Sequence, residues 1–156
     1  SHASLKFEVE RIGGGTAFIF ISGDFDYSDD LSAFEPLVRS NNARAVTFHS
    51  PGCNIANAME LGRVIRRLGL MTVQPRAIEC SSACSLAFFG GTIREAEPGA
   101  IGVHKSSFSG DIQINAQDAV SVVQQMTADI VTYMIEMGID PAVLQVSLQY
   151  DSHDIR

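Results

Sequence analysis

The chain has 156 residues, of which 46% are hydrophobic and 19% charged, as is typical of one soluble globular domain. Its 11 basic and 18 acidic side chains give a net charge of -7, and a surface of this sign disfavours nucleic acid as a partner. The longest apolar runs, Ala17–Ser22 and Cys84–Phe89, are too short to span a membrane.

Apolar periodicity separates strands, which repeat every second residue, from helices, which repeat every three to four. In chain order, the predicted elements are strands at Leu5–Arg11 and Ala17–Ser22, a helix from the Ser28–Asp30 cap to about Arg39, a strand at Ala43–His49, a helix from Asn54 to Leu68, short strands at Leu70–Val73 and Ala77–Glu79, a buried helix at Ser82–Phe89, strands at Arg94–Glu97 and Ala100–His104, a long amphipathic helix at Ala116–Met137 and a shorter one from Pro141 to about Gln149. This alternation predicts a single α/β domain, residues 1–156, with a largely parallel sheet.

Three predicted strands end in residues that could carry chemistry. They are followed by the turn Ser50–Cys53, by the segment Cys80–Cys84 and, at its own last residue, by His104. Binding and catalytic sites of open parallel sheets form at the carboxyl ends of the strands. We therefore expect these segments to meet at one edge of the sheet.

Ser82 is the candidate nucleophile. It lies where a strand gives way to a buried helix, so that unpaired helix amides beside it could stabilise an oxyanion. The G-x-S-x-G pattern of a nucleophile elbow is absent, and both Ser81 and Ser82 also suit the role of a helix N-cap. Taken alone, Ser82 is as well explained by the cap.

His104 is a candidate general base, since a neutral imidazole accepts a proton near pH 7, or else a satisfied core residue. The backbone amides around Gly52 and Cys53 could complete an oxyanion hole, or form only a tight strand-to-helix turn. No pair of histidines has the spacing of a zinc site, and we expect no metal and no cofactor.

The cysteines leave two interpretations open. Cys80 and Cys84 are four residues apart, and on one helical turn their Cα atoms would lie roughly 6 Å apart, near the upper end of the disulfide range. They are equally well read as two buried thiols.

Two segments of the chain resemble ClpP-type serine peptidases. Ser50-Pro51-Gly52-Cys53-Asn54-Ile55 resembles their S-P-G-G-x-[IV] turn, with Cys53 in place of the second glycine. Ser82–Gly91 resembles the segment that carries their nucleophile, at a matching distance from Cys53. Because Cys53 has a Cβ, a positive φ at this turn would be costly, which affects the geometry of the oxyanion hole.

The second half of the chain continues this resemblance. His104 stands where the catalytic histidine of these peptidases lies, and Ala116–Met137 resembles their long handle helix. Gly110, Asp111 and Ile112 fall near their substrate-pairing strand. The pattern C-x-S-A-C, followed by G-G and by P-G-A-x-[IL]-G-x-H, is similar to a bacterial group of periplasmic or secreted ClpP-like proteins.

The resemblance implies a ClpP/crotonase-like spiral of β-β-α units and a serine hydrolase, with peptide or protein as its substrate. Ser82 would attack, His104 would accept its proton, and backbone amides of Cys53 and Ala83, beside Gly52, would hold the oxyanion. Asp154 fits the spacing of the third triad member best, and Asp151 is the alternative. Since relatives continue beyond this aspartate, we expect the domain to be truncated at its C-terminus.

The resemblance further implies a periplasmic or secreted location and allows a homo-oligomer. The sequence begins Ser-His-Ala without a Met, as a trimmed or processed chain would, so we expect any signal peptide to lie outside it. Two other functions stay open. The fold could serve as a non-catalytic binding module whose apolar stripe on the long helix meets a partner, or as a crotonase-type acyl-CoA enzyme with the same oxyanion hole.

Overall fold

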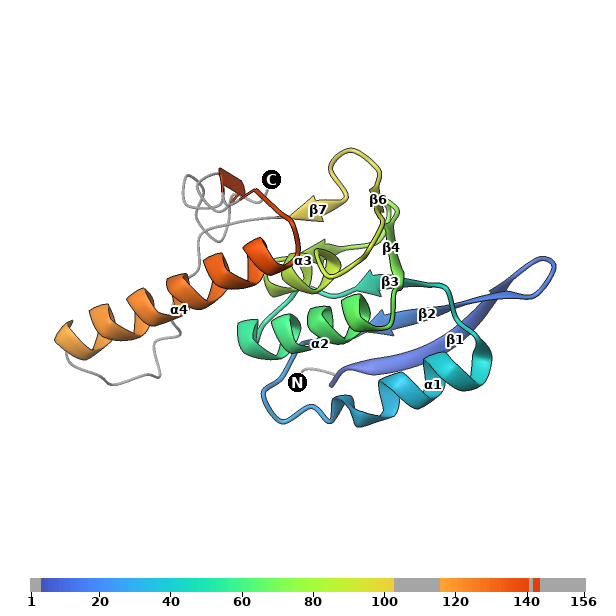
Figure 1. Ribbon diagram of the computed structural model, residues 1–156, viewed down its shortest axis with the longest axis horizontal. Helices are drawn as coiled ribbons and strands as arrows, with labels where there is room; N and C mark the ends of the chain where they lie inside the picture. The colour runs from blue at the N-terminus through green and yellow to red at the C-terminus, as the bar shows by residue number, and fades with distance from the viewer. Residues whose placement is uncertain (1–3, 103–115, 141, 144–156) are drawn as a thin grey trace. The chain divides into compact units, whose positions relative to one another are not determined.

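The computed structural model describes residues 4–102, 116–140 and 142–143 (Figure 1). Its elements, in chain order, are β1 (Lys6–Ile12), β2 (Thr16–Ser22), the 3-10 helix η1 (Leu31–Ala33), α1 (Phe34–Asn41), β3 (Ala45–His49), α2 (Ile55–Arg67), β4 (Met71–Gln74), β5 (Cys80–Ser81), α3 (Ala83–Phe88), β6 (Arg94–Ala96), β7 (Ile101–Gly102) and α4 (Ala116–Glu136). The chain forms two compact units, residues 1–103 and 104–156, and each is described separately here.

The first unit contains a five-stranded sheet with the order β1-β2-β3-β4-β6. β1 and β2 are joined by a glycine turn and pair in antiparallel fashion, whereas the following neighbours pair in parallel. A second, two-stranded sheet pairs β5 with β7, also in parallel. The predicted α/β fold with a mostly parallel sheet is therefore confirmed.

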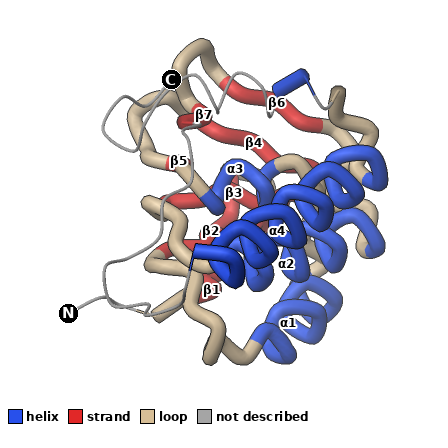
Figure 2. Tube along the Cα trace, turned by 90° about the vertical axis from the view of Figure 1, so that its left-hand side faces the viewer, coloured by secondary structure: helices blue, strands red, loops and turns tan. Residues whose placement is uncertain are grey.

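Three helices of this unit, α1, α2 and α3, lie on one face of the five-stranded sheet (Figure 2). Right-handed crossovers explain this, because the strand order advances in the same direction at each step from β2 to β6. The core lies between the helices and the sheet. Its fully buried side chains include Ile19, Ile21, Phe34, Val46, Phe48, Leu61 and Ile65.

Helices α2 and α3 approach each other backbone to backbone. A Cβ added to Gly90, just after α3, would lie 2.2 Å from the carbonyl oxygen of Gly62 in α2. A Cβ added to Gly91 would lie 2.2 Å from Oγ1 of Thr72, whose hydroxyl donates to the Phe88 carbonyl at 2.8 Å. These contacts fix α3 against both α2 and β4.

One predicted strand is wrong. Ala77–Glu79 forms a turn and bend instead, and the strand at this place is β5, only two residues long. The apolar residues Ala77 and Ile78 mimic a strand start, but Ile78 donates its amide to Pro75 in a turn. The remaining predicted strands match observed ones as far as the structure describes them.

The second unit contains α4, which matches the predicted long helix. Most of the predicted helix from Pro141 to about Gln149 lies outside the described residues. Among the described helices, none is long and apolar enough to cross a membrane.

Candidate functional site

The turn Ser50–Cys53 lies directly beside the segment that leads into α3, as expected from the strand ends. The Ser50 amide donates to the Glu79 carbonyl at 2.9 Å, and the Ser81 amide donates to the Ser50 carbonyl at 3.2 Å. Ser50 is fully buried, and its Oγ accepts a hydrogen bond from the Gly52 amide at 3.1 Å. Backbone pairing therefore brings together two segments that are 30 residues apart in the sequence.

Ser82 has a strained backbone. Its φ of 57° and ψ of -128° lie outside the regions that residues with a side chain favour, at a cost of about 1–3 kcal/mol. It immediately precedes α3 but makes no side-chain capping hydrogen bond to the helix. The cap therefore does not explain Ser82, whose half-buried side chain is free of that role.

Gly52 packs against this strained serine. A Cβ added to Gly52 would lie 2.7 Å from Cβ of Ser82, 2.7 Å from the Ala83 nitrogen and 2.8 Å from the Ser81 carbonyl oxygen. Real Cβ atoms do not approach other atoms this closely. Gly52 also has a φ of 108°, so both space and backbone conformation require glycine here.

The backbone of Phe25 holds the turn from the other side. Its amide donates to the Gly52 carbonyl at 2.8 Å, and its carbonyl accepts from the Asn54 amide at 3.0 Å. In a trans peptide the N–H points opposite to the C=O, so the Cys53 amide points away from Phe25. Cys53 keeps a φ of 108° despite its side chain, which is the costly conformation anticipated from the sequence.

Asn54 begins α2 as a side-chain cap. Its carbonyl oxygen Oδ1 accepts the Asn57 amide at 2.8 Å, which fixes the exit of the turn. Asn57 is itself buried and donates through Nδ2 to the Asp26 carbonyl at 2.7 Å. The Gly52–Cys53 peptide is thus held between β2's exit and the start of α2.

Gln74 is a structural residue of the site region that sequence analysis missed. Its buried amide donates to the carbonyls of Phe48 and Ile78, both at 2.8 Å, and accepts the Phe48 amide at 3.1 Å. The pairing of β3 with β4 covers only Ala45 and Val46, so this side chain replaces a strand neighbour at Phe48. Its sequence signal was a lone polar residue at the end of a strand, which is not distinctive.

β7 brings the chain to Ser82. Ser81 pairs with Gly102 in parallel, and the Ser82 amide donates to the Gly102 carbonyl at 3.0 Å. His104 follows two residues later but lies outside the described residues, as do Asp151, Asp154, Gly110, Asp111 and Ile112. The structure therefore brings together Gly52, Cys53, Ser82 and Ala83.

Cys80 and Cys84 form a disulfide, with their Cα atoms 5.3 Å apart. The bond joins β5 to the first turn of α3, with Ser82 midway between the two cysteines. Both cysteines are buried, with exposed fractions of 1% and 0%. Of the two interpretations left open by the sequence, the structure has the disulfide.

Cys53 is a free and exposed cysteine. Desolvation of the thiol, followed by the negative charges of Asp24 and Asp26, raises its pKa above the ordinary value. A raised pKa keeps the thiol protonated near neutral pH and lowers its nucleophilicity. The electrostatics thus argue against Cys53 as the nucleophile of this turn.

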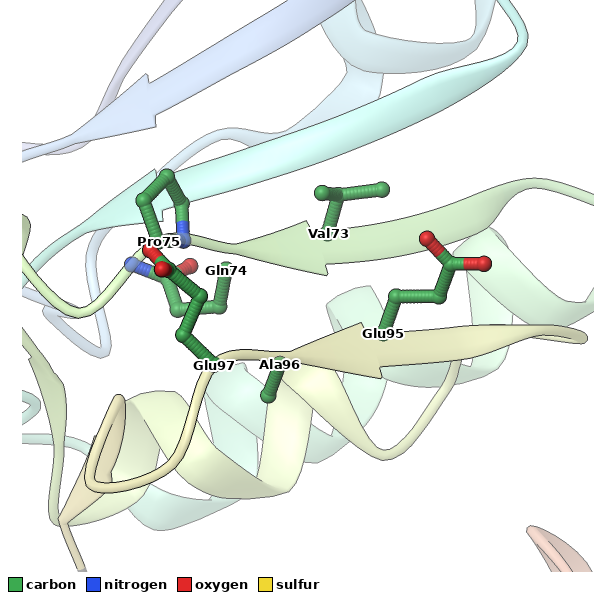
Figure 3. Close-up of a pocket in the computed structure, with 6 residues that line it drawn as sticks. All are labelled: Val73, Gln74, Pro75, Glu95, Ala96 and Glu97. Atoms are coloured by element: carbon green, nitrogen blue, oxygen red, sulfur yellow. The ribbon is translucent and has the colours of Figure 1, made fainter.

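A separate pocket of about 290 Å³ lies where β4 and β6 end, lined by Val73, Gln74, Pro75, Glu95, Ala96 and Glu97 (Figure 3). Apart from Gln74 and Pro75, its residues take no part in the turns described above. In the described part of the chain, no group of three or more His, Cys, Asp or Glu side chains could hold a metal ion. Neither observation adds a ligand to the Ser82 region.

No protein-family model and no curated protein matches this chain. The interpretation of the Ser82 region therefore depends on its geometry and on the sequence motifs.

Proposed function

We propose that this chain is a serine hydrolase of the ClpP/crotonase-like fold, with Ser82 as nucleophile and His104 as general base. The observation that carries the proposal is the strained Ser82 packed against Gly52. A serine held at a sharp strand-to-helix turn presents its hydroxyl rather than capping the helix. Because such strain is costly, it persists mainly where the surroundings impose it and function uses it.

Two backbone amides support an oxyanion hole. Ala83 is the first residue of α3, where amides have no partner within the helix. The Cys53 amide points away from Phe25, and Gly52 places its peptide against the Ser82–Ala83 peptide. Two such donors, facing the position of a developing negative charge, are the usual means of stabilising a tetrahedral intermediate.

The position of Gly102 supports His104 as the base. Gly102 is hydrogen-bonded to Ser82, and two residues of chain span at most about 7 Å. We propose His104 as the base because it follows Gly102 by only two residues in the sequence. Asp154, or Asp151 in its place, would orient the imidazole and stabilise its charged form.

In the proposed reaction, Oγ of Ser82 attacks the substrate carbonyl carbon while its proton passes to His104. The tetrahedral oxyanion collapses, the C–N bond of the substrate breaks, and the imidazolium gives its proton to the leaving amine. Water then attacks the acyl-enzyme with His104 again accepting a proton, which releases the acid and restores Ser82.

We propose peptides as the substrate class, on the resemblance to ClpP-type peptidases. We also propose a periplasmic or secreted location. The Cys80–Cys84 disulfide supports this location, since such bonds persist in oxidising compartments and are rare in the cytosol.

The test is covalent labelling with a fluorophosphonate, which reacts with activated serines. We expect the parent chain to be labelled at Ser82, with loss of labelling in Ser82→Ala and strong reduction in His104→Ala. Ser40→Ala, an exposed serine on α1, is the matched control and should label like the parent. Peptide mapping of the adduct would identify the modified residue.

Equal labelling of the parent and Ser82→Ala would overturn the nucleophile assignment. Absence of labelling in the parent would favour a second function, a binding module that retains the fold. The exposed valines Val120, Val122 and Val123 of α4 favour that alternative, because they leave apolar surface for a partner.

A further inference from the structure

The Cys80–Cys84 disulfide closes a ring of five residues with Ser82 at its centre. Extended backbone rises about 3.3 Å per residue, so an extended segment would separate the two cysteines by about 13 Å. A disulfide requires Cα atoms within about 4.4–6.8 Å, and here they are 5.3 Å apart. The bond therefore excludes a fully extended segment. A helical turn would also satisfy it, but Cys80 and Ser81 are paired with β7, so the chain has to bend sharply at Ser82.

Hydrogen bonds on either side of Ser82 orient its two peptide groups, but neither joins β5 directly to α3. On one side the Ser82 amide donates to Gly102 at 3.0 Å. On the other, the Ser82 carbonyl accepts both the amide of Ser85 at 3.0 Å and its hydroxyl at 2.6 Å. The elements that flank the turn are short, two residues in β5 and six in α3.

We infer that the Cys80–Cys84 disulfide is a positioning element for Ser82, which holds its backbone at positive φ and so presents its hydroxyl. This inference rests on the proposed function for its catalytic consequence, but its conformational part stands independently of it. Because both cysteines are buried, external thiols have little access to the bond. In the native state the disulfide therefore continues to restrain the backbone of Ser82.

The test compares the parent with the double variant Cys80→Ala/Cys84→Ala, using two readouts. The first is the intraresidue NOE between the amide and α protons of Ser82, which is strong only at positive φ. The second is the rate of fluorophosphonate labelling. We expect the variant to lose the strong NOE and to label at least about tenfold more slowly, with no loss of its folded spectrum.

The reduced parent gives a second measurement that keeps every side chain. Reduction by a dithiol at a urea concentration below the unfolding transition opens the bond, and alkylation then counts three thiols in place of one. We expect reduction to reproduce the effect of the double variant, and reoxidation to restore both the NOE and the labelling rate. Such rescue would separate positioning of Ser82 from general stabilisation.

Persistence of the strong NOE in a folded, disulfide-free chain would overturn the inference, as would an unchanged labelling rate where the parent is labelled. Unfolding of both the double variant and the reduced parent would also overturn it, because the bond would then hold the whole unit. If Ser82 relaxes as expected but the parent is never labelled, the conformational role of the disulfide is supported and the hydrolase proposal fails.

Discussion

The α-carbon of Gly52 lies so close to Ser82 that a methyl group on it would be 2.7 Å from the Ser82 β-carbon. Position 52 therefore does two things at once. It allows the turn after β3 to reach the nucleophile candidate, and it excludes any side chain from the space between them.

Gly52→Ala should lower the free energy of unfolding by about 3 kcal/mol, because the methyl group meets backbone atoms at a positive φ. Two glycines of the turn between β1 and β2 separate the cost of the positive φ from the cost of the steric contact. Gly14→Ala, with positive φ but open space, should cost about 1 kcal/mol, and Gly13→Ala, with neither constraint, should change stability by less than about 0.5 kcal/mol. Urea unfolding of the three variants measures the series; equal values for Gly52→Ala and Gly14→Ala would contradict the close contact.

Cys53→Gly should stabilise the chain by about 1 kcal/mol, because glycine adopts a φ of 108° without steric cost. Cys53→Ala is the matched control, since it removes the thiol but keeps a Cβ in the same conformation. Thermal or urea unfolding gives the comparison. No gain of the glycine variant over the alanine variant would show that Cys53 carries no strain.

Gln74→Met should lower the free energy of unfolding by about 2–4 kcal/mol. The methionine fills similar space but leaves the buried Phe48 amide and the Phe48 and Ile78 carbonyls without the side chain that binds them. Gln124→Met, at an exposed position of α4, should change stability by less than about 0.5 kcal/mol. Urea unfolding tests both, and similar losses in the two variants would refute a special role for Gln74.

Asp26→Asn should make the Cys53 thiol react faster with iodoacetamide at a fixed pH near neutrality. The negative charge of Asp26 contributes to the raised pKa of Cys53, so its removal lowers that pKa and increases the thiolate fraction. The pH at which alkylation reaches half its maximal rate should therefore fall. Glu10→Gln serves as control, since Glu10 pairs with Phe18 at the far end of β2 from Asp24.

An unchanged pH profile in Asp26→Asn, or an equal shift in Glu10→Gln, would contradict a local electrostatic cause. The sign of the shift is also diagnostic. A rise in the Cys53 pKa after Asp26→Asn would mean that the carboxylate stabilises the thiolate, contrary to the charge argument.

The sequence predicts most helices and strands here because their apolar residues follow regular periods over five residues or more. β5 escapes this approach, since two residues cannot show a period, and the neighbouring Ala77–Ile78 gave a false strand. The predicted meeting of Gly52 and Ser82 follows from a rule of topology, that parallel strands end at one edge.

Interactions between distant side chains and backbone leave no such pattern. Gln74 binds Phe48 across 26 residues through the side-chain amide that every glutamine carries. Phe25 binds Gly52 across 27 residues through its backbone amide, which does not depend on its side chain. The conformation of Ser82 also cannot be predicted from the sequence, because a strained serine and a capping serine are the same type of residue. Only the folded arrangement distinguishes them.

Gly90 lies at the opposite end of α3 from Ser82, and a substitution there could change the conformation at position 82 indirectly. The helix α3 has six residues, with Ser82 immediately before it and Gly90 just beyond its other end. A side chain at position 90 would collide with the Gly62 backbone, so that α2 or α3 would have to shift. Variation at position 90 would therefore retune the Ser82 turn without contacting it, so a search for altered activity need not be confined to the turn itself.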